Sequence, residues 1–330
     1  MPSLRLVLGS LFLLVALVLA HPEEARAQAS STLTSFPVLT LESSARAAAL
    51  AGASGAVNDG DVNGLFYNPA LLSPEAHQTA SLSYLNHLSD INAGAVAYSR
   101  TVERIGTTVG AGVRFVHWGD FDGRDAQGNP TGTFRAGDVA LTVTAAQAAG
   151  ERTRYGISVH AVHSGLETAR ATALALDLGT RYRIAERDFM LSGSVRNLSI
   201  VVDDFGPAET TLPADVRVSL SKGLAHLPLR LMVTAYDLNN TGTGVVGGET
   251  LDHVLAHLLV GGELTLSDVL QLRAGYNHRR STELALADRL DLAGLNLGFG
   301  IVLSRLSVDY AYSSWSTLGG LHQFTLRTRL

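Results

Sequence analysis

The last ten residues of the chain, Leu321-His322-Gln323-Phe324-Thr325-Leu326-Arg327-Thr328-Arg329-Leu330, decide the fold because polar and apolar side chains alternate along them. Successive side chains of an extended strand point to opposite faces, so Phe324 and Leu326 share one face and Thr325 and Arg327 the other. Strands of transmembrane β-barrels show this pattern, since they place apolar residues toward lipid and polar residues toward the lumen. The stretch therefore predicts a strand in the wall of a membrane barrel.

The same alternation recurs along the chain from Gln78 to its end. A single alternating strand also fits a soluble sheet, so the prediction rests on the whole series. We expect strands near residues 78–86, 91–99, 106–116, 135–146, 154–163, 172–183, 189–198, 215–222, 229–238, 256–265, 269–277, 292–302, 305–313 and 321–330. An even number of strands is typical of bacterial single-chain barrels. The predicted fold class is all-β: a transmembrane antiparallel β-barrel of about fourteen strands over residues 78–330.

The connections between these strands alternate between short and long, as periplasmic turns and extracellular loops do in outer-membrane barrels. With both termini in the periplasm, every long connection is extracellular. The long connections are expected at 117–134, 164–171, 199–214, 239–255, 278–291 and 314–320. A soluble sandwich or propeller is the alternative, but a propeller repeats a motif at a fixed period and none is present.

Two segments precede the barrel. Residues 1–29 have the features of a secretory signal peptide, with Arg5 before an apolar run and a small-residue cleavage site at Ala27-Gln28-Ala29. An uncleaved anchor helix is the alternative, although the run is shorter than a membrane span requires. Residues 30–77 lack strand patterning and contain a capped, alanine-rich helix near 43–50. We expect this segment to plug the lumen; a periplasmic tail is the alternative.

Composition excludes several classes of protein. The chain has no cysteine, which excludes disulfides and thiolate chemistry. Its formal net charge is -5 and no basic stripe is visible, so nucleic acid is not an expected partner. A mean hydropathy of +0.18 is too mild for a helical membrane protein but suits a barrel, whose lumen-facing residues are polar.

No catalytic residues, metal site or cofactor are predicted. Asp120, Asp122 and Asp125 have part of the spacing of a calcium loop, but Arg124 occupies a ligand position and the closing glutamate is missing. His160 and His163 face opposite sides of one strand, and no nucleophile elbow occurs. The charged residues expected to face the lumen carry both signs, so we interpret them mainly as a salt-bridge network, because buried charges must be paired.

The segment before the barrel carries a family resemblance. Ala51-Gly52-Ala53, Asn58-Asp59 and Phe66-Tyr67-Asn68-Pro69-Ala70 are similar to the N-terminal signature of FadL-like outer-membrane barrels. Other stretches resemble the PorV/PorQ family of type IX secretion proteins within that group, and its PorQ-like branch most. They are Phe36-Pro37 through Arg46, the loop Gly119–Phe134, and the runs Val195–Leu198, Leu212–Asp215, Pro228–Leu231 and Tyr236–Leu238.

The resemblance implies a scaffold in the outer membrane that anchors a PorZ-like surface protein, together with a PorU-like sortase that links secreted cargo to lipopolysaccharide and a PorV-like barrel. Outer-membrane lipids are the other expected contact. The long first loop is the predicted docking site, through Trp118, Asp120, Phe121, Asp122 and Asn129. Phe66, Tyr67, Asn68 and Pro69 are expected to be structural residues of the plug. The alternative function is FadL-like transport of long-chain fatty acids or other hydrophobic compounds.

Overall fold

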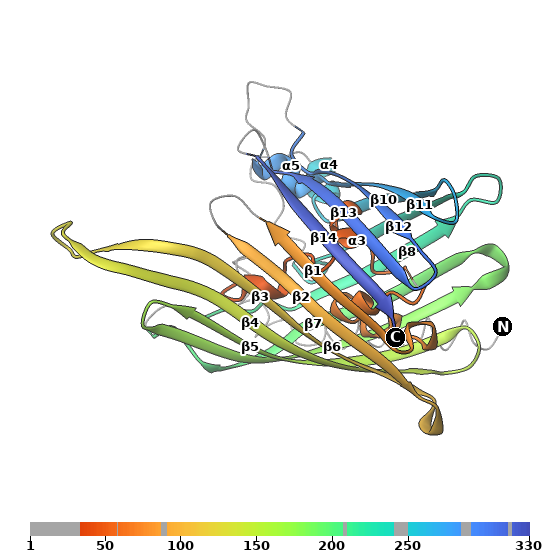
Figure 1. The fold of residues 1–330 in the computed structure, drawn as a ribbon, viewed down its shortest axis with the longest axis horizontal. Coiled ribbons are helices and arrows are strands. Elements are labelled where there is room, and N and C mark those ends of the chain that lie inside the picture. The colour runs from red at the N-terminus through yellow and green to blue at the C-terminus, as the bar shows by residue number, and fades with distance from the viewer. Residues whose placement is uncertain are drawn as a thin grey trace.

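The computed structural model describes residues 34–57, 59–86, 91–206, 210–240, 250–284, 292–315 and 319–330. The predicted signal peptide, 1–29, lies outside the described residues. The strands form a closed antiparallel barrel in which each one pairs with its neighbours in sequence and β1 pairs with β14, as predicted (Figure 1). They are β1 (Thr79–Asn86), β2 (Asn92–Val102), β3 (Thr107–Arg124), β4 (Pro130–Ala148), β5 (Thr153–Leu166), β6 (Ala169–Ile184), β7 (Phe189–Asp203), β8 (Asp215–Gly223), β9 (Leu229–Ala235), β10 (Leu258–Thr265), β11 (Leu270–Asn277), β12 (Leu295–Val302), β13 (Leu306–Ser314) and β14 (Gly320–Arg329).

The outer surface of the barrel is apolar, and the alternation in sequence produces it. On β4, Val139, Leu141 and Val143 are 44%, 50% and 55% exposed, while the intervening Thr142 and Thr144 are buried in the lumen. Such an exterior is stable only against lipid, because exposed apolar area of this extent is unfavourable in water. No helix among the described residues is long and apolar enough to cross a membrane.

Three predicted connections differ from the structure: 117–134, 164–171 and 199–214, of which residues 199–203 belong to β7. The expected loop 117–134 is largely strand, because β3 and β4 pair with each other as far as Arg124 and Pro130. The resulting hairpin projects well beyond the barrel wall (yellow in Figure 1). The expected loop 164–171 is a tight turn, since β5 ends at Leu166 and β6 begins at Ala169. The alternation of side chains could not predict where these strands end. Outside the membrane a strand can have polar residues on both faces, so the pattern is lost while the strand continues.

The short helices lie in three parts of the chain. Two of them, α4 (Thr250–Leu255) and α5 (His278–Leu284), lie within connections expected to be long loops. The segment before the barrel contains η1 (Pro37–Leu39), α3 (Ala45–Ala49), η2 (Val62–Phe66), η3 (Pro69–Leu71) and η4 (Pro74–Ala76), and the turns at the other end contain η5 (Glu103–Ile105) and η6 (Ala185–Arg187). The N-cap of α3 is Ser44, whose side chain accepts a hydrogen bond from the Ala47 amide at 3.3 Å.

The lipid-facing surface can be tested by placing a charge on it. Leu141→Arg puts a cation on the outer face near the middle of the membrane-spanning part of β4, so we expect it to lower the free energy of unfolding by about 2–4 kcal/mol. Thr133→Arg is the matched control, because Thr133 is exposed on the same strand outside the barrel. The measurement is urea unfolding in phospholipid vesicles, and equal midpoints for the two variants would contradict a lipid-facing Leu141.

Candidate functional site

The lumen is filled by the segment before the barrel. Phe36, Leu50, Leu65 and Phe66 are completely buried, and η3 packs against β4, β5 and β6. Glycines in the wall allow this close approach, since a methyl group at Gly156 would collide with the Pro69 backbone. A solute that crossed the barrel straight along its axis would therefore require this plug to move.

A buried ion cluster attaches the plug to one side of the wall. Arg46 of α3 donates to both carboxylate oxygens of Glu263 on β10, at 2.9 and 2.8 Å, and forms an ion pair with Asp59 at 2.6 Å. Arg273 of β11 donates to the same Glu263 at 2.7 Å and to Asp309 at 2.6 Å. These contacts satisfy the lumen charges in the way the sequence predicts, by pairing opposite signs.

Beyond the plug, the extracellular end of the lumen contains an open basin of about 550 Å³. Its walls come from residues 34–42 and 212–217, from the ends of β9 and β11, and from α5. Arg217 pairs with Asp215 at 2.6 Å and Arg279 pairs with Asp237 at 3.1 Å, so the charges of this basin are largely matched.

Aromatic rings make the basin amphipathic. The guanidinium groups of Arg217 and Arg279 lie over the ring of Tyr236, at 5.6 and 5.0 Å from its centroid. Arg280 lies 5.1 Å over Trp315. Burial raises the pKa of the Glu42 carboxyl at the base of the basin, against the attraction of four nearby arginines.

The barrel wall is interrupted beside this basin. The β7–β8 ladder ends at Arg196 and Asp215, whereas β7 continues to Asp203 with β6 as its partner. A β-bulge marks the point, with Asn197 in the left-handed conformation at φ 58°. Its amide leaves the ladder and donates instead to the Asp177 carboxylate at 2.8 Å. At this bulge in the β6–β7 pairing, a side chain of β6 thus replaces a backbone acceptor.

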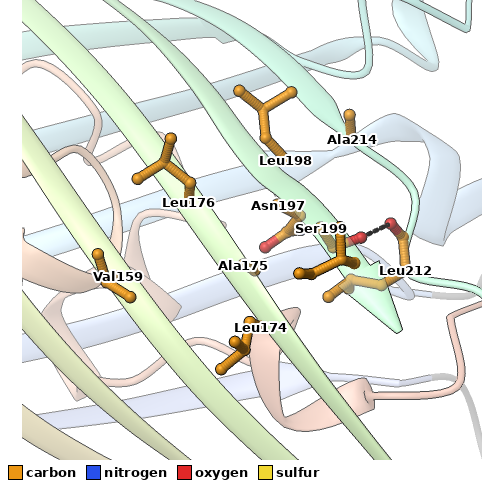
Figure 2. Close-up of a pocket in the computed structure, with 10 residues that line it drawn as sticks. Val159, Leu174, Ala175, Leu176, Asn197, Leu198, Ser199, Leu212 and Ala214 are labelled. Atoms are coloured by element: carbon orange, nitrogen blue, oxygen red, sulfur yellow. Dashed lines mark hydrogen bonds between the residues drawn. The ribbon is translucent and has the colours of Figure 1, made fainter. Parts of the chain in front are cut away.

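Residues from three strands and the chain before β8 surround a second hollow, of about 540 Å³, at this interruption (Figure 2). Apolar side chains that face the membrane form one part of it. They are Val159 of β5, Leu174 and Leu176 of β6, and Leu198 and Ile200 of β7. Beside them the Ser199 hydroxyl donates to the Leu212 carbonyl at 3.0 Å, which holds residues 212–214 next to the free edge of β7.

The wall hollow and the basin share Asn197, Leu212 and Ala214 as lining residues. These three residues therefore stand between a compartment open to the extracellular side and a hollow lined by lipid-facing side chains. The two hollows are therefore adjacent, with only these residues between them.

The predicted docking residues do not form one surface. Trp118 is half-buried and packs against the core cluster inside the extracellular end of the lumen. Asp120 and Phe121 are exposed on the projecting part of β3, where Asp120 pairs with Arg135 at 2.9 Å and Phe121 stacks on Phe134 with centroids 5.3 Å apart. Asp122 is exposed on the same strand and Asn129 closes the turn at its tip. These residues belong to a hairpin strand and its turn rather than to an irregular loop.

The four signature residues lie in the plug and contact its surroundings in different ways. Phe66 is buried beneath the guanidinium of Arg114, 4.9 Å from its ring centroid. The Tyr67 hydroxyl lies 3.2 Å from that of Ser44, and Asn68 caps η3, of which Pro69 is the first residue. No group of three or more potential metal ligands occurs within the described part of the chain.

Comparisons with known proteins bear on the fold. No family model matches the chain, and no curated protein matches it. Solved structures do match: a FadL homologue of Pseudomonas aeruginosa with TM-score 0.53 and 12% identity, over 87% of this chain and 98% of that one. The toluene transporter TodX of Pseudomonas putida has TM-score 0.55 and 13% identity, over 89% and 98% of the two chains. The monoaromatic hydrocarbon channel CymD has TM-score 0.54 and 12% identity, over 89% and 97%.

The fold is that of a FadL-like outer-membrane barrel. Together with the apolar exterior, it makes this chain an integral β-barrel of the outer membrane. The narrower PorV/PorQ resemblance stays a prediction.

Sequence reasoning did not single out the wall interruption. The stretches Val195–Leu198 and Leu212–Asp215 contributed to the family resemblance, yet no role followed from them. An asparagine at the end of an alternating strand is the available signal, because asparagine tolerates the left-handed conformation better than most residues. The role of Asn197 depends on its hydrogen bond to Asp177 of the neighbouring strand. The alternation of side chains does not predict that these two residues meet.

The ion cluster predicts a strong effect of removing its central carboxylate. Glu263→Ala leaves the buried Arg46 and Arg273 without their shared partner, so we expect it to lower the free energy of unfolding by about 3–5 kcal/mol. The control is Glu186→Ala, because Glu186 forms an ion pair with Arg152 but is 66% exposed. That change is expected to cost at most about 1 kcal/mol. Denaturant titration in detergent measures both, and similar small effects would show that the cluster does not fasten the plug.

Proposed function

We propose that this barrel transports small hydrophobic compounds from the cell exterior into the outer membrane through its side wall. The observation that carries the proposal is the meeting of the basin and the wall hollow at Asn197, Leu212 and Ala214. An apolar molecule that enters the basin would pass between these residues into the hollow, and from there into lipid. Each hollow has the size of a typical small-molecule site.

Two further points support this function. The neighbours in fold include a toluene transporter and a monoaromatic hydrocarbon channel, which handle compounds of this kind. A polar, plugged lumen is a poor path for a hydrophobic compound, but a lateral route leaves the lumen at the level of Asn197 and avoids the ion cluster. A molecule would be desolvated at the aromatic rings of the basin before it reached the wall.

The route can be tested by filling it. Ala214→Trp places an indole where the two hollows meet, so we expect uptake of radiolabelled toluene or oleate to fall toward the level of host cells without the barrel. Ala111→Trp is the control, since Ala111 is exposed on the lipid face of β3, away from the hollow. Outer-membrane fractions and heat-modifiable electrophoretic mobility establish that both variants are folded and abundant. Wild-type uptake equal to background, or full uptake by Ala214→Trp, would contradict lateral transport.

A second candidate is the scaffold of type IX secretion suggested by the PorV/PorQ resemblance, and the projecting hairpin favours it. Residues 118–124 and 130–134 belong to no other ladder among the described residues, so both edges of this ribbon are free. Free edges and the exposed Phe121 would suit binding of a PorZ-like surface protein, with a PorU-like sortase and a PorV-like barrel in the same assembly.

The scaffold candidate predicts stable partners. Gentle detergent extraction and affinity capture through a C-terminal tag, followed by mass spectrometry, should recover a large surface protein and a sortase in fixed ratio. Deletion of residues 120–131 should weaken that recovery, whereas Ala214→Trp should leave it unchanged. A barrel that elutes alone with a bound apolar molecule would reject the scaffold and support transport.

A further inference from the structure

We propose that Arg154 and Arg181 form a binding site for a small oxyanion, a phosphate or carboxylate group, at the periplasmic end of the lumen. The proposal is independent of the transport function. The two residues are direct cross-strand partners on β5 and β6, and both lie on the lumen side of the wall. Arg154 lies at the start of β5, directly after the turn at 149–152. Arg181 lies near the end of β6, shortly before η6.

Both guanidinium groups are buried with hydrogen-bonding capacity unused. Arg154 is 6% exposed and Arg181 is 7% exposed, so solvent barely reaches the pair. Nε and Nη1 of Arg181, and Nε of Arg154, are buried without any hydrogen-bond acceptor. Arg154 donates from Nη2 to the Ala146 carbonyl at 3.3 Å. Like charges directly opposite each other repel, and buried donors without acceptors are costly, so an anion between them would remove both penalties.

Protein groups do not supply this counter-charge as they do elsewhere in the lumen. Arg46, Arg217 and Arg273 each have a carboxylate oxygen within 2.8 Å. Arg154 and Arg181 form no ion pair with a carboxylate of the described residues. Glu75, exposed at the start of η4, is the acidic group close enough to act on both electrostatically. One carboxylate without an ion-pair contact leaves the two arginines with an excess of positive charge.

The position of the pair indicates how an anion would reach it. The plug covers the next lumen-facing residues on the side away from the turns. Pro69 lies against Gly156, and Asn68 lies against Gly179. The pair therefore lies on the periplasmic side of η3. Arg183, the next lumen-facing residue toward the turn, is exposed and adds positive charge on that approach. The forked donors of arginine match the oxygens of phosphate and carboxylate, which defines the class of ligand.

The test uses the full-length barrel in nanodiscs of neutral lipid, with inorganic phosphate as the probe in calorimetric titration and thermal unfolding. We expect phosphate to bind wild type and raise its unfolding temperature, and Arg181→Gln to weaken binding about tenfold or more. Arg170→Gln is the control, because Arg170 is exposed at the opposite end of the same strand and carries the same charge.

A second variant separates ligand binding from a structural role. In phosphate-free buffer Arg181→Met should unfold at the same or a higher temperature than wild type, since it removes an unpaired buried charge. Nanodiscs with phosphatidylglycerol distinguish the source of the anion. If Arg181-dependent stabilisation appears with that lipid alone, a headgroup supplies the phosphate; if it requires added phosphate, a soluble anion does. The site is rejected if wild type responds to neither source, or if Arg181→Gln binds phosphate as tightly as wild type does.

Discussion

Backbone hydrogen bonding inside the membrane is the constraint on which the rest of this structure depends. An unpaired amide in the hydrocarbon core costs several kcal/mol, so a sheet can span the membrane only if its edges meet. Here β1 pairs with β14 from Thr79 and Arg329 to Asn86 and His322, which closes the barrel. Closure creates an enclosed lumen. The packing of the plug and the pairing of the lumen charges both follow from that enclosure.

The filling explains the unusual composition of the wall. Glycines admit the backbone of the plug, and charges of opposite sign lie where strand and plug meet. Pairing is what makes these charges tolerable, because an isolated buried ion is strongly destabilising. Arg154 and Arg181 differ from these charges. They are as buried as the paired arginines, but no carboxylate of the described residues forms an ion pair with them.

The end of the β7–β8 pairing is subject to the same constraint. The bulge at Asn197 removes an amide from the ladder, and Asp177 accepts its hydrogen bond from the lumen side. Asp177 is itself held by His160, whose Nε2 lies 3.0 Å from its carboxylate. The bulge therefore keeps the Asn197 amide hydrogen-bonded within the β6–β7 pairing, through a buried side chain of β6. A polar group of the lumen thus holds the backbone of β7 beside the apolar hollow.

The sequence by itself determined the barrel, because a period of two is a local property that every strand carries and that lipid enforces on each one separately. It also determined the helix at Ala45–Ala49, whose cap lies within one turn of it. Only the tertiary structure decided that β3 and β4 extend into a hairpin, that Trp118 packs inward, and that β7 bulges at Asn197. Each of these depends on a partner distant in sequence: pairing across the hairpin, the packed lumen, and Asp177 on the neighbouring strand. Alternation assigns a side chain to a face, but it does not say which residue meets it there.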